Sequence, residues 1–374
     1  MKLLDSAFCS FVGVVIVLML AFSTNAQNSG RVEKNLKINL DFQCARAIVD
    51  FLERNRVGDD DLSRIAGLSG NQRLIKKVAG YNSTATPETF KKTLRQTVEN
   101  QSLSEDPFDW QSVKKNLPQI RLLINRIEKE QAAFFSELES LIQPYTPPDL
   151  KADITATFLV GGGALGFTMD GSDGFHVALH KIGGDYEGLK YLVAHELYHS
   201  VQGFGMKRRQ ANLNFVKPPE NVRNSLIIIE NTYTEGTATL VGDSLNAKNL
   251  KPFGQSQQDE YKKNLMRLRQ NFALFEMLLF QAQNDPNADI EQLYNIGFST
   301  EFDETLYYVG YRMAQGIEKY KGKQAIAALV AKNPIEFFNQ YIEIYKKNND
   351  PKLIKFSKST EDILLNLQQW KDKT

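Results

Sequence analysis

The chain has few cysteines and histidines, which are the residues that most disulfide, redox and metal sites use. Its 374 residues include two cysteines and four histidines. Two cysteines exclude a disulfide-dense scaffold, and a chain of this length can bury a core large enough to fold without disulfides. Charge of one sign is also lacking, because 45 basic residues stand against 44 acidic ones, for a formal net charge of +1. That balance gives no electrostatic reason to bind nucleic acid, and we expect no nucleic-acid partner.

Long apolar runs are equally scarce, and the one at the N-terminus indicates export. Lys2 precedes an apolar run over residues 11–22, and the small residues Thr24 and Ala26 follow it. This order is typical of a secretory signal peptide, and the run is short of the roughly 20 residues that span a bilayer. An uncleaved anchor is the alternative. We expect a signal peptide over residues 1–26, no membrane span after its cleavage, and a protein of the bacterial periplasm or the extracellular medium.

The two cysteines have separate fates under this interpretation. Cleavage after Ala26 removes Cys9 and leaves Cys44 as the single cysteine, so no internal disulfide can form. Cys44 lies in an apolar helical pattern, which favours a buried structural thiol over a nucleophile.

The hydrophobic pattern divides the rest of the chain at a proline-rich segment, residues 144–148. Before it, apolar residues recur at helical spacing, with an interruption expected at Pro118. After it, β-branched and alternating segments predict strands within residues 152–182, and helical patterns resume beyond them. The sequence therefore predicts an α+β, predominantly α-helical fold with a small Gly-rich antiparallel β segment, divided into a helical N-terminal region (27–148) and a second domain (149–374).

The motif that carries chemistry is His-Glu-Leu-Tyr-His at residues 195–199, within a predicted helix. Each helical residue advances about 100°, so His195 and His199 lie on one face, one turn apart, where both imidazoles can bind one Zn²⁺. Glu196 lies beside that face and can take a proton from a zinc-activated water as general base. The alternative is a pair of solvated histidines. The apolar residues around the motif argue against it, because buried imidazoles need partners.

A catalytic zinc site needs a third protein ligand, and this ligand has to be a carboxylate because no histidine follows His199. The next strong helical pattern offers Glu230 and Glu235, which are about 140° apart around a helix and so are not expected to reach the same ion. We favour Glu235, because Gly236 and the small residues after it would let its helix approach the zinc helix closely. Glu230 stays an alternative. For the carboxylate that is not a ligand, the alternatives are support of a histidine ring and a solvated side chain.

Three segments together carry a family resemblance: residues 195–199, residues 234–238 (Thr-Glu-Gly-Thr-Ala) and residues 307–312 (Tyr-Tyr-Val-Gly-Tyr-Arg). Over about residues 150–345 the chain resembles gluzincin-type zinc peptidases of secreted bacterial proteins, known mainly as a domain family of unknown function. The resemblance implies a zincin-like metallopeptidase domain, a Glu-Gly pair that supplies the third zinc ligand, and a peptide or protein substrate.

The last of these segments also has a physical interpretation. A zinc peptidase benefits from a hydrogen-bond donor aimed at the developing oxyanion, and Tyr307, Tyr308, Tyr311 and Arg312 are candidates. We expect Tyr307 or Tyr311 to serve. The alternative is an aromatic helix face packed in the core.

Two further features resemble a metal site and a dinucleotide site, and we interpret both differently. His176 and His180 share one face of a predicted strand, yet no acidic residues lie near them in the sequence, so we expect polar surface positions instead of a second metal site. Residues 161–166 match GxGxxG, but they run into residues 167–171, whose pattern is that of a strand or turn, whereas a dinucleotide site needs a helix that opens at the glycines. We expect a tight turn and no dinucleotide. The strands before the zinc helix could also hold an extended peptide at a sheet edge.

The sequence thus predicts an exported zinc metallopeptidase that hydrolyses peptide bonds. Zn²⁺ would be held by His195, His199 and Glu235, with Glu196 as general base. The alternatives are a non-catalytic envelope binding protein that keeps a zincin fold and a structural zinc, and a metallohydrolase of a non-peptide amide or ester. The oligomeric state is left open.

Overall fold

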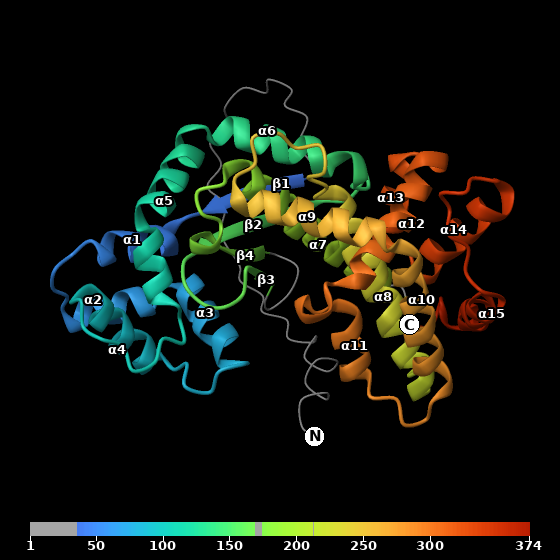
Figure 1. The fold of residues 1–374 in the computed structure, drawn as a ribbon, viewed down its shortest axis with the longest axis horizontal. Coiled ribbons are helices and arrows are strands. Elements are labelled where there is room, and N and C mark those ends of the chain that lie inside the picture. Colours follow the sequence, from blue (N-terminus) through green and yellow to red (C-terminus); the bar gives the residue numbers. More distant parts are fainter. Residues whose placement is uncertain (1–35, 169–173, 212) are drawn as a thin grey trace, which may run out of the picture. The chain divides into compact units, whose positions relative to one another are not determined.

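A computed structural model describes residues 36–168, 174–211 and 213–374 of the chain (Figure 1). Asn35–Thr374 form one compact unit. The expected signal peptide lies outside the described residues, and the division at residue 148 stays a prediction. Within the three described ranges, no helix is both long and apolar enough to cross a membrane.

The described residues form an α+β fold in which helices predominate, as predicted. The strands are β1 (Leu36–Asp41), β2 (Ala152–Leu159), β3 (Gly166–Thr168) and β4 (Gly174–Ala178). The α-helices are α1 (Gln43–Leu52), α2 (Asp59–Ala66), α3 (Ser69–Ala79), α4 (Pro87–Val98), α5 (Trp110–Lys129), α6 (Gln131–Ile142), α7 (Tyr186–Gln210), α8 (Glu220–Val241), α9 (Pro252–Met266), α10 (Leu268–Asn284), α11 (Ile290–Phe298), α12 (Thr305–Lys321), α13 (Lys323–Leu329), α14 (Ile335–Lys347) and α15 (Lys358–Leu367).

The four strands form one sheet in the order β1-β2-β4-β3. β1 and β4 both run parallel to β2, and only β3 is antiparallel, to β4. The predicted antiparallel arrangement therefore holds for the β3–β4 pair alone, and the sheet as a whole is mixed. The physical reason is the short strand β3, which follows β2 in the chain but pairs at the far side of β4. The chain reverses direction before β3 and again before β4, so β4 runs in the same direction as β2.

Strand β1 comes from the region predicted to be helical. Its sequence alternates the apolar residues Leu36, Ile38 and Leu40 with polar ones, and Ile38 pairs with Ile154 in the middle of β2. Between these two strands the chain forms helices α1 to α6, which is the long crossover that parallel neighbours require. Residues before the proline-rich segment thus contribute an edge of the same sheet.

Helix α4 begins as predicted, with Pro87 as its first residue and the Thr86 side chain accepting a hydrogen bond from the Thr89 amide at 3.1 Å. The interruption predicted at Pro118 is wrong, because α5 continues through this residue. The buried residues Ile120 and Ile124 extend the packed face of α5 beyond the proline, and this packing holds the helix together despite one missing backbone donor.

Cys44 lies in α1 and is a buried free thiol, as predicted. Burial raises its pKa, which disfavours the nucleophilic thiolate.

Three helices place the residues of interest: α7 packs against β2, β4 and α8, and α8 packs against α12. The expectation that Gly236 faces the zinc helix is wrong. A Cβ atom on Gly236 would lie 2.2 Å from the carbonyl carbon of Gly310, so these two glycines let α8 and α12 approach closely. Gly242, at the end of α8, is the glycine that lies against α7, where a Cβ atom would meet His195 Cβ at 2.9 Å.

Candidate metal centre

His195 and His199 are brought together by α7. Asp185 caps this helix, because its side chain accepts a hydrogen bond from the Gly188 amide at 2.9 Å. One turn separates the two histidines, and their Nε2 atoms lie 3.1 Å apart. The HExxH spacing therefore gives two imidazole nitrogens aimed at one point, as the sequence predicts.

Glu235 completes this group from α8. Its Oε2 atom lies 3.5 Å from His195 Nε2 and 3.1 Å from His199 Nε2. The same oxygen is buried, and the two imidazoles are the polar groups that approach it among the described residues. Together the three residues form a group that could hold a metal ion, with one ligand atom each and all three atoms within 4.8 Å of one another.

The charges of this group favour a bound cation. Burial alone would raise the pKa of Glu235, but the two imidazoles hold that pKa well below its usual range. Burial alone would lower the pKa of His199, but the Glu235 carboxylate outweighs it and raises the pKa to about 9. The carboxylate thus draws a proton onto a histidine when nothing else supplies positive charge. Two imidazole nitrogens and one carboxylate oxygen are a ligand set that suits Zn²⁺, which would supply that charge.

Gln202 orients one of these imidazoles, and sequence reasoning missed it. Its side-chain oxygen lies 2.9 Å from His199 Nδ1, while its amide nitrogen donates to Thr234 O at 2.9 Å and to Thr237 Oγ1 at 2.7 Å. Because that nitrogen has to donate, the oxygen is left to accept from Nδ1–H. His199 Nε2 is then free to bind a metal. The position of Gln202 three residues after His199, on the same helix face, could have indicated this role.

Glu230, the alternative third ligand, lies elsewhere. It is half-buried on α8, and it is not in the group of possible metal ligands found among the described residues. Burial raises the pKa of Glu230, and the charge of Arg209 opposes this.

Glu196 lies beside the metal-ligand group and next to the sheet edge. A Cβ atom on Gly166 would lie 2.8 Å from Glu196 Oε1, so the missing side chain leaves room for this carboxylate. Gly166 begins β3, which is the edge strand of the sheet. The general-base candidate and an edge strand of the described sheet thus lie side by side.

The two tyrosine candidates differ in their surroundings. Tyr307 stacks on His195 with ring planes 8° apart and centroids separated by 6.3 Å. Its hydroxyl group has no hydrogen-bond partner in the described part of the chain. Tyr311 is fully buried, donates a hydrogen bond to Asp243 at 2.7 Å and accepts one from Gln315 at 2.7 Å. Its hydroxyl group is therefore already engaged, and Tyr307 is the candidate that adjoins the metal-ligand group.

Two more residues near this group carry no recognisable sequence signal. Tyr294 in α11 is 38% exposed and contacts Phe298, whose ring in turn contacts Tyr307. Glu304 precedes α12, and burial, followed by the nearby carboxylate of Glu235, raises its pKa to about 7. Both residues lie far from the HExxH motif in sequence, and only the packing of α11 and α12 against α8 brings them near.

The prediction that His176 and His180 are surface residues is wrong. His176 in β4 is fully buried, and its ring stacks on Phe167 with centroids 4.6 Å apart. His180 is 2% exposed, and its Nδ1 atom accepts a hydrogen bond from the Gly161 amide at 3.1 Å. Helices cover this end of the sheet, so both imidazoles are part of the interior. Neither belongs to the group of possible metal ligands among the described residues.

The Gly-rich segment is a tight turn between β2 and β3. Gly161 and Gly162 have φ angles of +100° and +80°, which L side chains rarely adopt. Besides the bond from Gly161 to His180, the amides of Gly162 and Gly163 donate to Phe108 O at 2.7 Å and to the Tyr81 hydroxyl at 3.0 Å. All three amides donate to acceptors of the protein itself, so the segment is the tight turn that the sequence predicts.

A family model described as "Putative zinc dependent peptidase (DUF5700)" matches residues 62–350. The chain belongs to this family. Membership confirms the expected relationship to zinc peptidases, and it confirms zinc as the cofactor because the family is described as zinc dependent. The match also begins well before residue 150, so it includes much of the region that the expected resemblance did not reach. No curated protein and no solved structure matched the chain.

Proposed function

We propose that this member of the family is an exported zinc metallopeptidase that hydrolyses peptide bonds. His195, His199 and Glu235 would hold the zinc ion. The observation that carries the proposal is the placement of two carboxylates, one among the ligand atoms and one beside them. Glu235 joins the imidazoles in one group of ligand atoms. Glu196 lies beside that group with its carboxylate at the edge of the sheet. A structural zinc site has no use for the second carboxylate, whereas a hydrolase needs a base.

Each residue then has a defined task. When bound, zinc polarises the scissile carbonyl group and lowers the pKa of a water molecule towards 7. Glu196 would take a proton from the attacking water as the water oxygen forms a bond to the carbonyl carbon. The same carboxyl group then protonates the leaving nitrogen as the carbon–nitrogen bond breaks. Tyr307 would donate a hydrogen bond to the developing oxyanion, since its hydroxyl group has no other described partner.

The position of β3 supports a peptide as the substrate. Among the described residues β3 is an edge strand of the sheet, and it begins at Gly166, against Glu196. An edge strand presents backbone donors and acceptors on its outer side. An extended peptide that adds to this edge would bring its backbone to the general base. The half-exposed ring of Tyr294 would then be available to a substrate side chain.

The replacement Glu196→Gln tests the mechanism. We expect this variant to bind zinc as the wild-type protein does and to hydrolyse a mixed peptide library, analysed by mass spectrometry, at least about 100-fold more slowly, because a general base contributes that much or more. Glu187→Gln is the matched control on the same helix, since Glu187 forms an ion pair with Lys190 at 2.7 Å and should leave hydrolysis unchanged.

The outcomes separate the alternatives. Normal hydrolysis by Glu196→Gln would show that the mechanism is wrong. Zinc binding by the wild-type protein without hydrolysis of any peptide would favour a binding protein, or a hydrolase of a non-peptide amide or ester.

A further inference from the structure

Two consecutive residues before α12 have an unusual backbone conformation. Asp303 and Glu304 have φ angles of +62° and +48°, in the left-handed region that non-glycine residues rarely occupy. Such conformations persist only where surrounding contacts determine them, and they concentrate at functional sites. The pair joins the short 3₁₀ helix η3 (Thr300–Phe302) to α12, which carries Tyr307.

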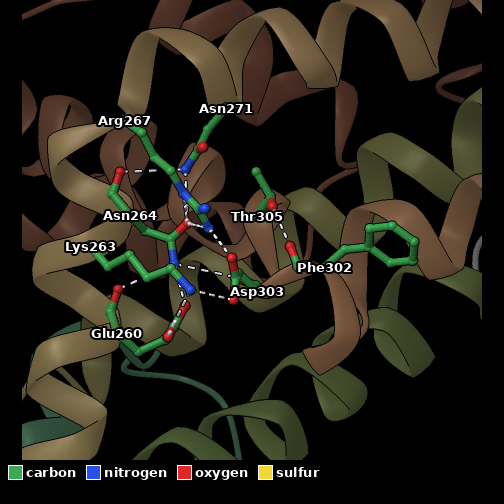
Figure 2. A network of polar contacts seen from close by, with 8 residues as sticks. All are labelled: Glu260, Lys263, Asn264, Arg267, Asn271, Phe302, Asp303 and Thr305. Carbon is green, nitrogen blue, oxygen red and sulfur yellow. Dashed lines mark hydrogen bonds and ion pairs between the residues drawn. The ribbon is translucent and has the colours of Figure 1, made fainter.

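The contacts that hold Asp303 come from α9 and from Arg267, which joins α9 to α10 (Figure 2). The Asp303 carboxylate accepts hydrogen bonds from Lys263 Nζ at 2.6 Å and from Arg267 at 2.8 Å. The backbone carbonyl of Asp303 accepts a hydrogen bond from the side-chain amide of Asn264 at 3.2 Å. Asn264 in turn accepts from Arg267 and from Asn271. Both asparagines are fully buried, so this network has little freedom to rearrange. We call these five residues the Asp303 clasp.

The start of α12 is thereby fixed in position. Thr305 donates to Phe302 O at 2.6 Å, and the Tyr307 amide donates to Glu304 O at 3.0 Å. Tyr307 lies in the first turn of the helix, four residues beyond Asp303, and its ring is the one that stacks on His195. A shift of this first turn would move the Tyr307 hydroxyl group more than it would move the helix as a whole.

We propose that Asp303 is a positioning residue, and that the Asp303 clasp holds Tyr307 in place over His195 and the metal centre. The catalytic part of this inference rests on the proposed function, because Tyr307 acts on substrate only if the protein is a hydrolase. The structural part does not, because the stacking of Tyr307 on His195 can be measured without substrate or metal.

Asp303→Asn is the most informative replacement. Asparagine adopts the left-handed conformation as readily as aspartate, so the variant removes the charge that Lys263 and Arg267 bind without changing the backbone preference. Asp350→Asn is the matched control. Asp350 binds Lys319 at 2.6 Å and Tyr320 at 2.9 Å, near the opposite end of the same helix α12.

The first measurement needs no activity. The chain has four histidines, so selective ¹³C labelling gives four imidazole signals, which single replacements can assign. We expect Asp303→Asn to shift the His195 signal of the metal-free protein, because the ring of Tyr307 moves relative to it, and Asp350→Asn to leave it unchanged. An unshifted His195 signal in folded Asp303→Asn would overturn the proposal.

The second measurement is a double-mutant cycle on peptide hydrolysis. We expect Asp303→Asn to lower kcat about 10- to 100-fold with little change in KM, since misplacing a group that acts in the transition state has this effect. In a Tyr307→Phe background the same replacement should lower kcat less than about twofold, because the hydroxyl group through which it acts is gone. Equal losses in both backgrounds would show a merely structural role and overturn the proposal.

A second variant covers the case in which Asp303→Asn does not fold. Lys263→Gln removes one of the two cations and leaves Arg267 in place, so it should shift the His195 signal and lower kcat in the same direction by a smaller factor. An unchanged signal and unchanged kcat in folded Lys263→Gln would contradict the proposal. Failure of the proposed function itself would look different: the wild-type protein would hydrolyse no peptide, while the His195 signal would still report on Asp303.

Discussion

The four histidines form two pairs that look alike in the sequence and differ in the structure. His195 and His199 are four residues apart, and so are His176 and His180. In the first pair the two Nε2 atoms lie 3.1 Å from each other and close to Glu235. In the second pair each imidazole has separate surroundings, which include the Phe167 ring and Arg73 for His176 and the Gly161 amide and Asp109 for His180.

Backbone conformation accounts for the difference. Four residues are one turn of a helix, so the first pair points in one direction from α7. The second pair begins in β4 and ends in the 3₁₀ helix η2 (Leu179–Lys181), where the chain turns away from the strand. Spacing therefore predicts a metal site only together with the element that carries it. The first pair therefore belongs to a group that could hold a metal ion, whereas the second pair lies in the interior.

Replacing one histidine of each pair should reveal the largest difference between the two pairs. We expect the purified wild-type protein to hold about one zinc ion per chain and His199→Ala to hold almost none, because two remaining ligands bind zinc weakly. His180→Ala should retain zinc wherever it folds. Metal analysis of the three proteins checks this, and loss of zinc from folded His180→Ala alone would contradict the comparison.

The same replacements should affect stability in the opposite order, so that His180→Ala lowers the free energy of unfolding more than His199→Ala does. His180→Ala leaves the buried Gly161 amide without its acceptor and opens a cavity, and we expect it to lower the free energy of unfolding by about 2–4 kcal/mol. His199→Ala, in metal-free protein, should cost less, because that side chain is partly exposed. Urea denaturation of the metal-free proteins measures both. A smaller loss for His180→Ala than for His199→Ala would show that the buried pair is not structural.

Gln202 should affect the first pair alone. Replacing it with Ala removes the acceptor for His199 Nδ1–H, and we expect zinc affinity to fall about 10- to 100-fold, as is usual for residues that orient a ligand. Thr237→Val, which removes one of the two acceptors that hold the Gln202 amide, should have a smaller effect in the same direction. Competition with a zinc chelator measures both affinities. Unchanged affinity in Gln202→Ala would mean that His199 needs no such support.

The two pairs should also give opposite pH dependences in the metal-free protein. Burial, aided by Lys181, lowers the pKa of His180 to about 4, so its contribution to stability is present above about pH 6.5 and is lost as the pH falls towards 4. Glu235 raises the pKa of His199 to about 9, so its contribution is present below about pH 6.5 and is lost as the pH rises through 9.

Urea denaturation between pH 4 and 9 tests this pair of signs. His180→Gln should flatten the acidic side of the stability profile, and His199→Gln should flatten the alkaline side. The alkaline loss should also disappear when zinc is added, because a metal ligand has to be neutral. An alkaline loss that persists in His199→Gln would assign it to another group.

Local pattern accounts for what could be predicted from the sequence. One helical turn brings His195 and His199 together, and the absence of a later histidine points to a carboxylate as the third ligand. The helical pattern around Cys44 likewise predicts its burial. In each case the deciding interaction is set by residues a few positions apart or by composition.

The remainder depends on contacts between distant segments. The burial of His176 and the engagement of the Tyr311 hydroxyl with Asp243 arise from packing that no local period encodes. Gly236 does allow close helix packing, but its partner is Gly310 in α12, more than 70 positions away, and not α7. The alternating residues of β1 did carry a strand signal, yet the sheet direction follows from where β3 pairs.

The zinc content of Glu235→Gln beside that of Glu230→Gln tests the central claim most directly. Both glutamates lie on α8, but only Glu235 has an oxygen within 3.5 Å of both imidazole Nε2 atoms. We predict that Glu235→Gln loses the zinc ion and that Glu230→Gln keeps it, at about one per chain as in the wild-type protein. Zinc retained by Glu235→Gln, or absent from the wild-type protein even after zinc is supplied, would contradict the assignment of this group as the metal centre.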